Sequence, residues 1–257
     1  MDIIIIIGII FSFACIIFGF TLEGGSIIAL LQPTAALIVI GGTIGAIIIS
    51  FPYDTLKKFP QVLKIAFTKQ NYDLKSYIPY FKNLSIKTRK EGLLSMESEI
   101  SNTNMNPFIK KGLQMVVDGI DSDSIRDNLN TKLENISQRH EKYIEMFTAA
   151  GGYAPTMGII GTITSLVIIL SNLNDASVLG EKIAVAFVAT LYGIGTANLI
   201  WLPISSKLRE IDKNEIIQKE LFIEAILLIQ QGINPNNLVS KLEGFLPENS
   251  PQYTDGD

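Results

Sequence analysis

The stretch Met146–Leu170, MFTAAGGYAPTMGIIGTITSLVIIL, decides how this chain folds. It contains no Asp, Glu, Lys or Arg, and as a helix it is long enough to cross the roughly 30 Å hydrocarbon core of a bilayer. Its proline and glycines would weaken a helix in water, whereas membrane helices use small residues to pack closely. The stretch therefore predicts a transmembrane helix with a tightly packed neighbour.

Three more uncharged runs have a similar length: Ile3–Phe20, Ile27–Phe51 and Ile183–Pro203. The first does not resemble a signal peptide, because Asp2 precedes it and no small-residue cleavage pattern ends it. The 257-residue chain is 47% hydrophobic, and its mean hydropathy of +0.33 is high for a soluble domain. We predict an all-α integral membrane protein with four transmembrane helices.

The polar residues are gathered in two blocks. Residues 1–51 and 146–203 form two transmembrane hairpins, which leaves a large helical domain at 52–145 and a helical tail at 204–247. Residues 248–257 are predicted to be disordered. Helical spacing of apolar residues is expected at Tyr53–Phe67, Ser85–Ile100, Pro107–Asp118, Ser124–Phe147 (running into the third span), and in a tail that breaks at Gly232–Pro235.

Basic residues predict the orientation. The connections between spans 1 and 2 and between spans 3 and 4 contain a single basic residue, Lys182. The other span ends are flanked by Lys57, Lys58, Lys64, Lys207, Arg209 and Lys213. By the positive-inside rule, both polar blocks and both termini are cytoplasmic.

Signals of enzymatic chemistry are lacking in the sequence. There is no P-loop, no nucleophile elbow and no Cys/His cluster with metal-ligand spacing, so we expect no metal, no cofactor and no catalytic residue. The single cysteine excludes a disulfide framework, and a net charge of −4 argues against a nucleic-acid-binding protein. The chain is predicted not to be an enzyme.

Hydroxyl groups are frequent in the third and fourth spans, at Thr156, Thr162, Thr164, Ser165, Thr190 and Thr196. Each can bond to a carbonyl of its own helix and have no further role. As a set, beside the carbonyl that Pro155 deprives of its donor, they could instead line an ion path. Conduction usually needs a carboxylate in the membrane, and these spans have none, so a partner would have to supply it.

Small residues also recur four positions apart in the spans, at Ala154/Gly158, Gly41/Gly45, Ala189/Gly193 and Gly193/Ala197. This spacing favours close helix packing. Two explanations stay open, packing within this chain and packing against other copies or a foreign helix.

Four blocks of the chain resemble the MotA stator subunits of the bacterial flagellar motor. GGYAPTMGIIGT (Gly151–Thr162) is similar to the third span of that family, and AFVATLYGIGTANLIWLP (Ala186–Pro203) to its fourth. Leu22–Ala46 and Glu220–Pro247 are similar to its hairpin and tail. The more distant ExbB/TolQ branch has one span before the large cytoplasmic portion, whereas this chain has two, so the flagellar branch is favoured.

The resemblance implies partners and a location. Copies of the chain, five by family resemblance, would surround a dimer of a MotB-like single-span protein whose transmembrane Asp carries the ion. Ion flow would turn the ring, and the cytoplasmic helices would push the rotor protein FliG. The complex would lie in the lipid of the bacterial plasma membrane.

The resemblance also implies functional residues. Pro155 and Pro203 match functional prolines, Thr190 matches a threonine that faces the ion path, and Thr156 is the next candidate. Sodium-driven relatives have a second threonine where this chain has Ala189. Because a methyl group cannot replace a hydration ligand, Ala189 suggests protons as the ion.

The rotor contact of the family uses an Arg and a Glu eight residues apart, which Arg89 and Glu97 match. Eight residues is a little over two helical turns, so both side chains are expected on a similar face of one helix. Two ordinary solvated charges are the alternative explanation. As alternative functions of the chain, an ExbB/TolQ-like energiser, a small secondary transporter and a membrane scaffold also stay open.

Overall fold

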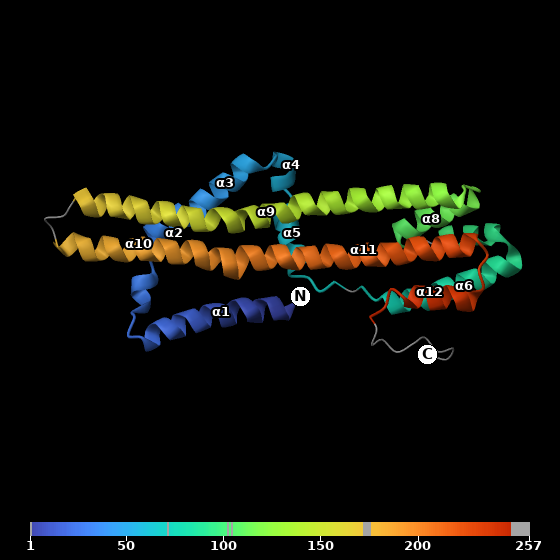
Figure 1. Cartoon of the computed structure of the whole chain (residues 1–257), viewed down its shortest axis with the longest axis horizontal. Helices are drawn as coiled ribbons and strands as arrows, with labels where there is room; N and C mark the ends of the chain where they lie inside the picture. Colours follow the sequence, from blue (N-terminus) through green and yellow to red (C-terminus); the bar gives the residue numbers. More distant parts are fainter. Residues whose placement is uncertain (1, 71, 102, 104, 172–175, 248–257) are drawn as a thin grey trace. The chain divides into compact units, whose positions relative to one another are not determined.

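The computed structural model describes residues 2–70, 72–101, 103, 105–171 and 176–247, and the regular structure in this part of the chain is entirely helical (Figure 1). Four helical segments are long and apolar enough to cross a membrane: Ile3–Leu22, Ile27–Ser50, Ser122–Ser171 and Leu179–Gln230. The predicted all-helical fold with four spans is confirmed. The predicted disorder of residues 248–257 lies outside the described residues.

Two compact units make up the chain. The first unit contains residues 1–69 and 140–211, and the second unit contains residues 70–139 and 212–257. Two long helices, α9 (Ser122–Ser171) and α11 (Leu202–Gln230), contribute to both units. The predicted continuity of the helix beginning near Ser124 with the third span is therefore confirmed.

The first span is the single helix α1 (Ile3–Leu22), which has no buried residue. Asp2 begins it, because its carboxylate accepts a hydrogen bond from the backbone N–H of Ile4. A helix that exposes isoleucine on every side is stable only in an apolar surrounding, so this helix faces lipid or other membrane helices.

The second span is broken, although the sequence predicts one run over Ile27–Phe51. A 3₁₀ turn, η1 (Ile27–Leu30), is followed by α2 (Pro33–Ala36), a π turn η2 (Leu37–Gly41) and α3 (Gly42–Ser50). The break precedes Pro33 because a proline has no N–H and pushes the residue before it out of the helical conformation. Gln32 is accordingly extended, with φ −117° and ψ 94°.

Two short helices follow the second span, α4 (Tyr53–Leu56) and α5 (Phe59–Ala66). The prediction of a single helix over Tyr53–Phe67 is wrong, because Pro60 restarts the helix at its first turn. Val62 and Ala66 of α5 are buried in a small core. The other buried members of that core are Ile144, Met146, Phe147, Ile204 and Leu208.

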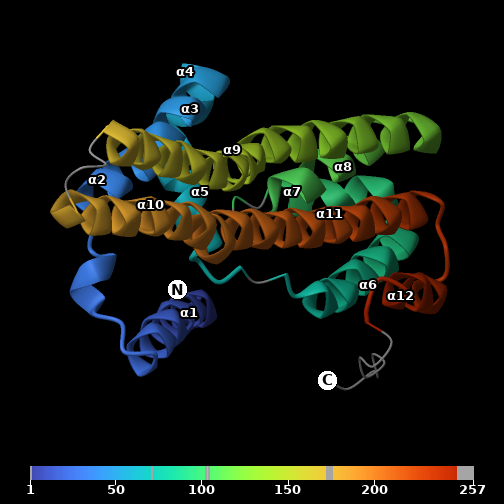
Figure 2. The same ribbon diagram turned by 60° about the vertical axis from the view of Figure 1, so that its left-hand side comes forward.

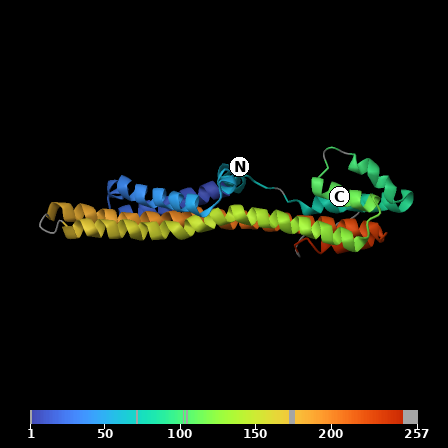
Figure 3. The ribbon, with the colours of Figure 1, turned by 90° about the horizontal axis from the view of Figure 1, so that it is seen from above.

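The third and fourth spans lie side by side in the first unit (Figures 1 and 3). The fourth span lies within α10 (Ala176–Thr196) and the π turn η4 (Ala197–Trp201), which leads directly into α11. The π turn directly before α11 lets the helix pass Pro203, whose ring would otherwise clash with a carbonyl of the preceding turn.

The second unit is a small helical domain with its own core. It contains α6 (Leu74–Glu91), η3 (Leu93–Met96), α7 (Glu97–Ile100), α8 (Pro107–Val117) and α12 (Pro235–Glu243), together with the ends of α9 and α11. In Figure 2, α12 lies beside α6. The largest fully buried side chains include Phe81, Leu113, Phe222 and Ile226. Each contributes about 1.5–3 kcal/mol through its removal from water.

The predictions for this unit have mixed outcomes. The helix expected at Pro107–Asp118 and the break at Gly232–Pro235 are confirmed by α8 and by the start of α12. The prediction of one helix over Ser85–Ile100 is wrong, because this range is divided among α6, η3 and α7. Asp73 caps a helix that starts earlier, and Gly92, at φ +85°, ends it.

Candidate ion pathway

The helices α9 and α10 pack backbone against backbone where both carry glycine. A β-carbon built on Gly193 of α10 would lie 2.6 Å from the carbonyl oxygen of Ala154 and 3.2 Å from the Cα of Pro155 in α9. A β-carbon on Gly158 of α9 would lie 3.0 Å from the carbonyl oxygen of Ala189. Because these contacts are to backbone atoms, they exclude any side chain and set the distance between the helices.

Packing within the chain thus explains part of the small-residue pattern. The pairs Ala154/Gly158 and Ala189/Gly193 face each other across the contact of α9 with α10. Gly45, in contrast, would meet no described atom within 4 Å if it carried a β-carbon, so the Gly41/Gly45 pair has no such contact in the described chain.

A pair of threonine hydroxyls lies beside this helix contact. Oγ1 of Thr162 in α9 and Oγ1 of Thr190 in α10 are 2.6 Å apart. The Thr162 oxygen is also 3.0 Å from the carbonyl oxygen of Ala186 and 3.1 Å from that of Gly158. The Thr190 oxygen is 3.5 Å from the Ala186 carbonyl oxygen. We refer to these two side chains and two carbonyls as the threonine cluster.

The threonine cluster has more acceptors than protons. Each hydroxyl has one proton to donate and two lone pairs, and each carbonyl oxygen has two lone pairs. Two protons cannot occupy all the short oxygen–oxygen contacts of the cluster, so lone pairs remain for a further partner. The group can therefore bind a water molecule, a hydronium ion or a small cation, and both threonines are partly exposed.

Thr162 belongs to the candidate site, but the sequence interpretation did not single it out, since it appeared only as one of six hydroxyls. A signal was present in the spacing. Gly158 and Thr162 are four residues apart on α9, as Ala186 and Thr190 are on α10, so each small residue shares a helix face with a threonine.

The other predicted pathway residues lie around the cluster in different ways. Pro155 lies at the close contact with Gly193. Ala189 is fully buried, and its Cβ would lie 2.7 Å from a β-carbon built on Gly161. Thr156 is exposed and donates to the Tyr153 carbonyl oxygen at 2.7 Å, which is a contact within its own helix.

Pro203 lies at the start of α11 and lines a cavity of about 250 Å³ between α1 and the end of the fourth span. Ile5, Ile9 and Ile204 form apolar walls of this cavity, and Lys207 also lines it. Pro203 thus contributes to the packing of the first span, and its predicted functional role stays a prediction.

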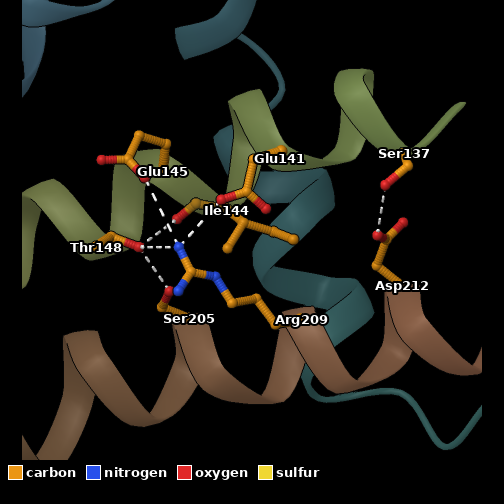
Figure 4. A network of polar contacts seen from close by, with 8 residues as sticks. All are labelled: Ser137, Glu141, Ile144, Glu145, Thr148, Ser205, Arg209 and Asp212. Carbon is orange, nitrogen blue, oxygen red and sulfur yellow. Dashed lines mark hydrogen bonds and ion pairs between the residues drawn. The ribbon is translucent and has the colours of Figure 1, made fainter. Parts of the chain in front are cut away.

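A polar network joins α9 to the first turns of α11 in the first unit (Figure 4). Arg209 Nη2 lies 3.0 Å from Glu141 Oε1 and 3.8 Å from Glu145 Oε2. Thr148 Oγ1 is 2.7 Å from Ser205 Oγ and 3.5 Å from Arg209 Nη2. All three charged side chains are about half exposed, so each pair adds little stability and the network chiefly fixes the register of the two helices.

Asp2 holds the beginning of α1 to two other segments. Its carboxylate is 2.8 Å from Lys207 Nζ, and its backbone N–H donates to the Phe67 carbonyl oxygen at 2.8 Å. The hydrogen bond from Lys207 lowers the pKa of the Asp2 carboxyl below its ordinary value.

Arg89 and Glu97 lie in different helices, contrary to the expectation that they share one. Arg89 is in the last turn of α6, and Glu97 is the first residue of α7. Gly92 ends α6, because its φ of +85° is incompatible with a continuing helix. Both side chains are exposed, and their contact with the rotor stays a prediction.

Comparisons with known proteins cover nearly the whole chain. Residues 100–221 match the MotA/TolQ/ExbB proton channel family, and residues 6–92 match the Motility protein A N-terminal family. Motility protein A of Bacillus subtilis is 39% identical over 249 residues, which cover 96% of this chain and 92% of that protein. Chemotaxis protein PomA of Vibrio alginolyticus is 35% identical and 96% of each chain is covered.

Two solved structures have the same fold. The chain is similar to one in the flagellar MotAB stator complex from Bacillus subtilis, with a TM-score of 0.88, 37% identity, and coverage of 94% of this chain and 95% of that one. For C. jejuni MotAB the TM-score is 0.92 at 27% identity, with 99% of this chain and 100% of that one covered.

Proposed function

Because this chain belongs to the MotA/TolQ/ExbB proton channel family, as a MotA stator subunit of the flagellar motor, we propose that the threonine cluster is part of its proton path. It is a multi-pass membrane protein and a channel subunit, not an enzyme. The observation that supports the proposal is the surplus of acceptor lone pairs at Thr162 and Thr190, within the stretches Met146–Leu170 and Ile183–Pro203, which contain no carboxylate.

A MotB-like single-span partner would supply the missing carboxylate. Two solved relatives are MotAB complexes, and both cover more than nine tenths of this chain. A proton carried by an Asp of the partner could pass to water held at the threonine cluster, because hydroxyl and carbonyl oxygens stabilise a hydronium ion by accepting its hydrogen bonds. Copies of the chain, five in number, would surround a dimer of this partner.

The residues around Thr190 favour protons over sodium as the conducted ion. Ala189 offers a methyl group buried against Gly161, where a threonine would offer a further oxygen. A sodium ion must exchange several hydration oxygens for protein oxygens, whereas a proton needs only a chain of hydrogen bonds.

The polar segments would lie in the cytoplasm with both termini, as the basic residues next to the span ends indicate. The transmembrane hairpins would then be residues 1–51 and 146–203, with cytoplasmic segments at 52–145 and 204–247. Torque would pass to FliG through the second unit, where Arg89 and Glu97 are exposed.

Co-expression in a strain that lacks both stator genes tests the proposal. This chain with a MotB-like partner should restore swimming, and the two proteins should co-purify. A partner with its transmembrane Asp changed to Asn should co-purify but restore no swimming. Swimming with the Asn variant would contradict the proposal, since the acid would then have to come from elsewhere.

A further inference from the structure

The break in the second span leaves backbone polar groups without helical partners. Leu31 has φ −87° and ψ 88° and Gln32 is also extended, so the helical hydrogen-bond ladder stops there. The carbonyl of Leu30 and the N–H of Gln32 are two of the groups left without a helical partner by this interruption. In a hydrocarbon environment an unsatisfied backbone group is costly, since no water is present to bond to it.

One side chain from another span bonds to both groups. The Tyr192 hydroxyl of α10 donates to the Leu30 carbonyl oxygen, and it accepts the Gln32 N–H at a nitrogen–oxygen distance of 3.4 Å. The Tyr192 ring packs against a buried cluster from the second span and α10, made up of Ala35, Val39, Val185, Val188 and Ala189. Tyr192 thus stabilises the broken second span in two ways, because its ring packs against the span and its hydroxyl bonds to two of its backbone groups.

Tyr192 and Thr190 stand on different faces of the same helix. Two residues correspond to a rotation of about 200° in an α-helix, so the two side chains point in roughly opposite directions. Thr190 meets Thr162 of α9, and Tyr192 meets the break before Pro33. A rotation or slide of α10 would therefore disturb both contacts at once.

We propose that Tyr192 is a positioning residue of the ion pathway: its hydroxyl fixes α10 against the broken second span and so keeps Thr190 in register with Thr162. The proposal rests on the proposed role of the threonine cluster. It does not require Tyr192 to touch the ion.

The chain offers a matched control in Tyr153. Its hydroxyl is 2.8 Å from Ser50 Oγ, and Ser50 Oγ also donates to the Ala46 carbonyl oxygen at 2.8 Å. This tyrosine also joins the second span to its neighbour, but among the described residues no backbone group is bonded to its hydroxyl. Tyr153→Phe therefore removes a hydroxyl of the same kind without leaving a broken backbone unsatisfied.

The experiment compares Tyr192→Phe with Tyr153→Phe in the complex with the MotB-like partner. Amide hydrogen exchange is measured in the purified complex for a peptide that spans residues 27–36. Motor speed is measured per incorporated stator unit, from the speed steps that appear as single units join a motor. A defect that merely reduced stability would lower the number of units and leave the speed per unit unchanged.

Tyr192→Phe should speed the exchange of that peptide about fivefold, the change expected for the loss of one ordinary hydrogen bond. It should also lower the speed per unit at low load at least about twofold, whereas Tyr153→Phe should change neither quantity. An unchanged exchange rate in Tyr192→Phe would contradict a stabilising role of the hydrogen bonds between Tyr192 and the break in the second span. Faster exchange with an unchanged speed per unit would overturn the positioning role.

Two further results keep the tests separate. If Tyr192→Phe does not assemble, the double variant Tyr192→Phe/Pro33→Ala should restore assembly, because a continuous helix would give the Leu30 carbonyl and the Gln32 N–H helical partners. Failure of that rescue would overturn the proposal. Full speed in Thr190→Val would argue against the proposed function of the cluster, while the exchange result would still report on Tyr192.

Discussion

At the scale of single residues, the distinguishing feature is a surplus of acceptors inside an apolar helix pair. Thr162 and Thr190 share two protons among more oxygen contacts than those protons can occupy. Thr196 differs from them, because its hydroxyl contacts the Tyr192 and Gly193 carbonyl oxygens of its own helix and is not paired with a hydroxyl of a second helix in the described chain.

The difference between these threonines predicts the effect of removing a hydroxyl. Thr190→Val should lower motor speed per stator unit by about tenfold while the complex still assembles, because valine has the same shape but no hydrogen-bonding oxygen. Thr196→Val serves as the control and should leave the speed within about twofold, since its hydroxyl bonds only within its own turn. Normal speed in Thr190→Val would remove that residue from the path.

A second residue-scale prediction concerns Asp2 and pH. Because the Asp2 pKa is lower in the folded chain than its ordinary value of 3.8, ionised Asp2 contributes stability at neutral pH, and that contribution is lost as the pH falls below about 4. Asp2→Asn should lower the melting temperature of the purified complex at pH 7 by about 1–3 °C, with the difference disappearing at acid pH. A difference that grew at acid pH would contradict this assignment.

At the scale of helices, backbone approach decides which side chains meet. Gly158 and Gly193 allow α9 and α10 to touch through their backbones, and this contact brings Thr162 to Thr190. The membrane provides no hydrophobic drive between helices, so close packing of this kind holds them together.

Two glycines of α10 make a matched test of that contact. Gly193→Ala would place a methyl group 2.6 Å from the Ala154 carbonyl oxygen, and overpacking of this kind costs about 1–3 kcal/mol. Gly195→Ala meets no described atom within 4 Å and should be neutral or slightly stabilising. The melting temperature and the yield of the complex distinguish them. Equal behaviour of the two variants would be evidence against a tight contact at Gly193.

The sequence predicted the helices well and their interruptions poorly. Uncharged length was enough to identify the four spans, and the proline at Pro107 correctly marked the start of α8. The break before Pro33 follows from the proline, but the backbone groups that it frees are bonded by Tyr192, a partner about 160 residues away that a local pattern does not reveal. The end of α6 depends on the positive φ of Gly92. A glycine in the sequence does not predict this end by itself, because glycine is also tolerated within helices.

The site was predicted only in part, for a related reason. Thr190 was identified through a family resemblance, but the meeting of Thr162 with Thr190 requires the rotation of two helices about their axes. That rotation is set by the contacts of Gly158 and Gly193, which are properties of the packed pair and not of either helix alone. For Arg89 and Glu97 the expected common helix was wrong, while their exposure leaves the predicted rotor contact open to test.

The predicted contact of Arg89 with the rotor protein can be tested by reversing the charges on both proteins. Arg89→Glu should reduce swimming strongly, and a reciprocal change of an acidic rotor residue to a basic one should restore part of it. Such rescue follows from attraction between opposite charges, and it should weaken as ionic strength rises. Lys90→Glu, at the neighbouring exposed position, is the control. If no rotor change rescues Arg89→Glu, the residue has another role.

At the scale of the whole molecule, the chain has the architecture of a channel but not the acid that a proton channel needs. Its four uncharged stretches, Ile3–Phe20, Ile27–Phe51, Met146–Leu170 and Ile183–Pro203, contain hydroxyls, carbonyls and close helix contacts, yet no carboxylate. A subunit of this composition would conduct only together with a partner, and the two related structures are MotAB complexes. In the proposed pathway, the oxygens at Thr162 and Thr190 and the methyl group of Ala189 would select the ion that passes.

The swimming speed of a stator-deletion strain that carries this chain and its partner tests proton conduction most directly, measured first without sodium and then with a protonophore. Speed should be unchanged when sodium is withdrawn and should fall to zero when the protonophore removes the proton gradient. Swimming that stops without sodium and continues in the presence of the protonophore would contradict the account.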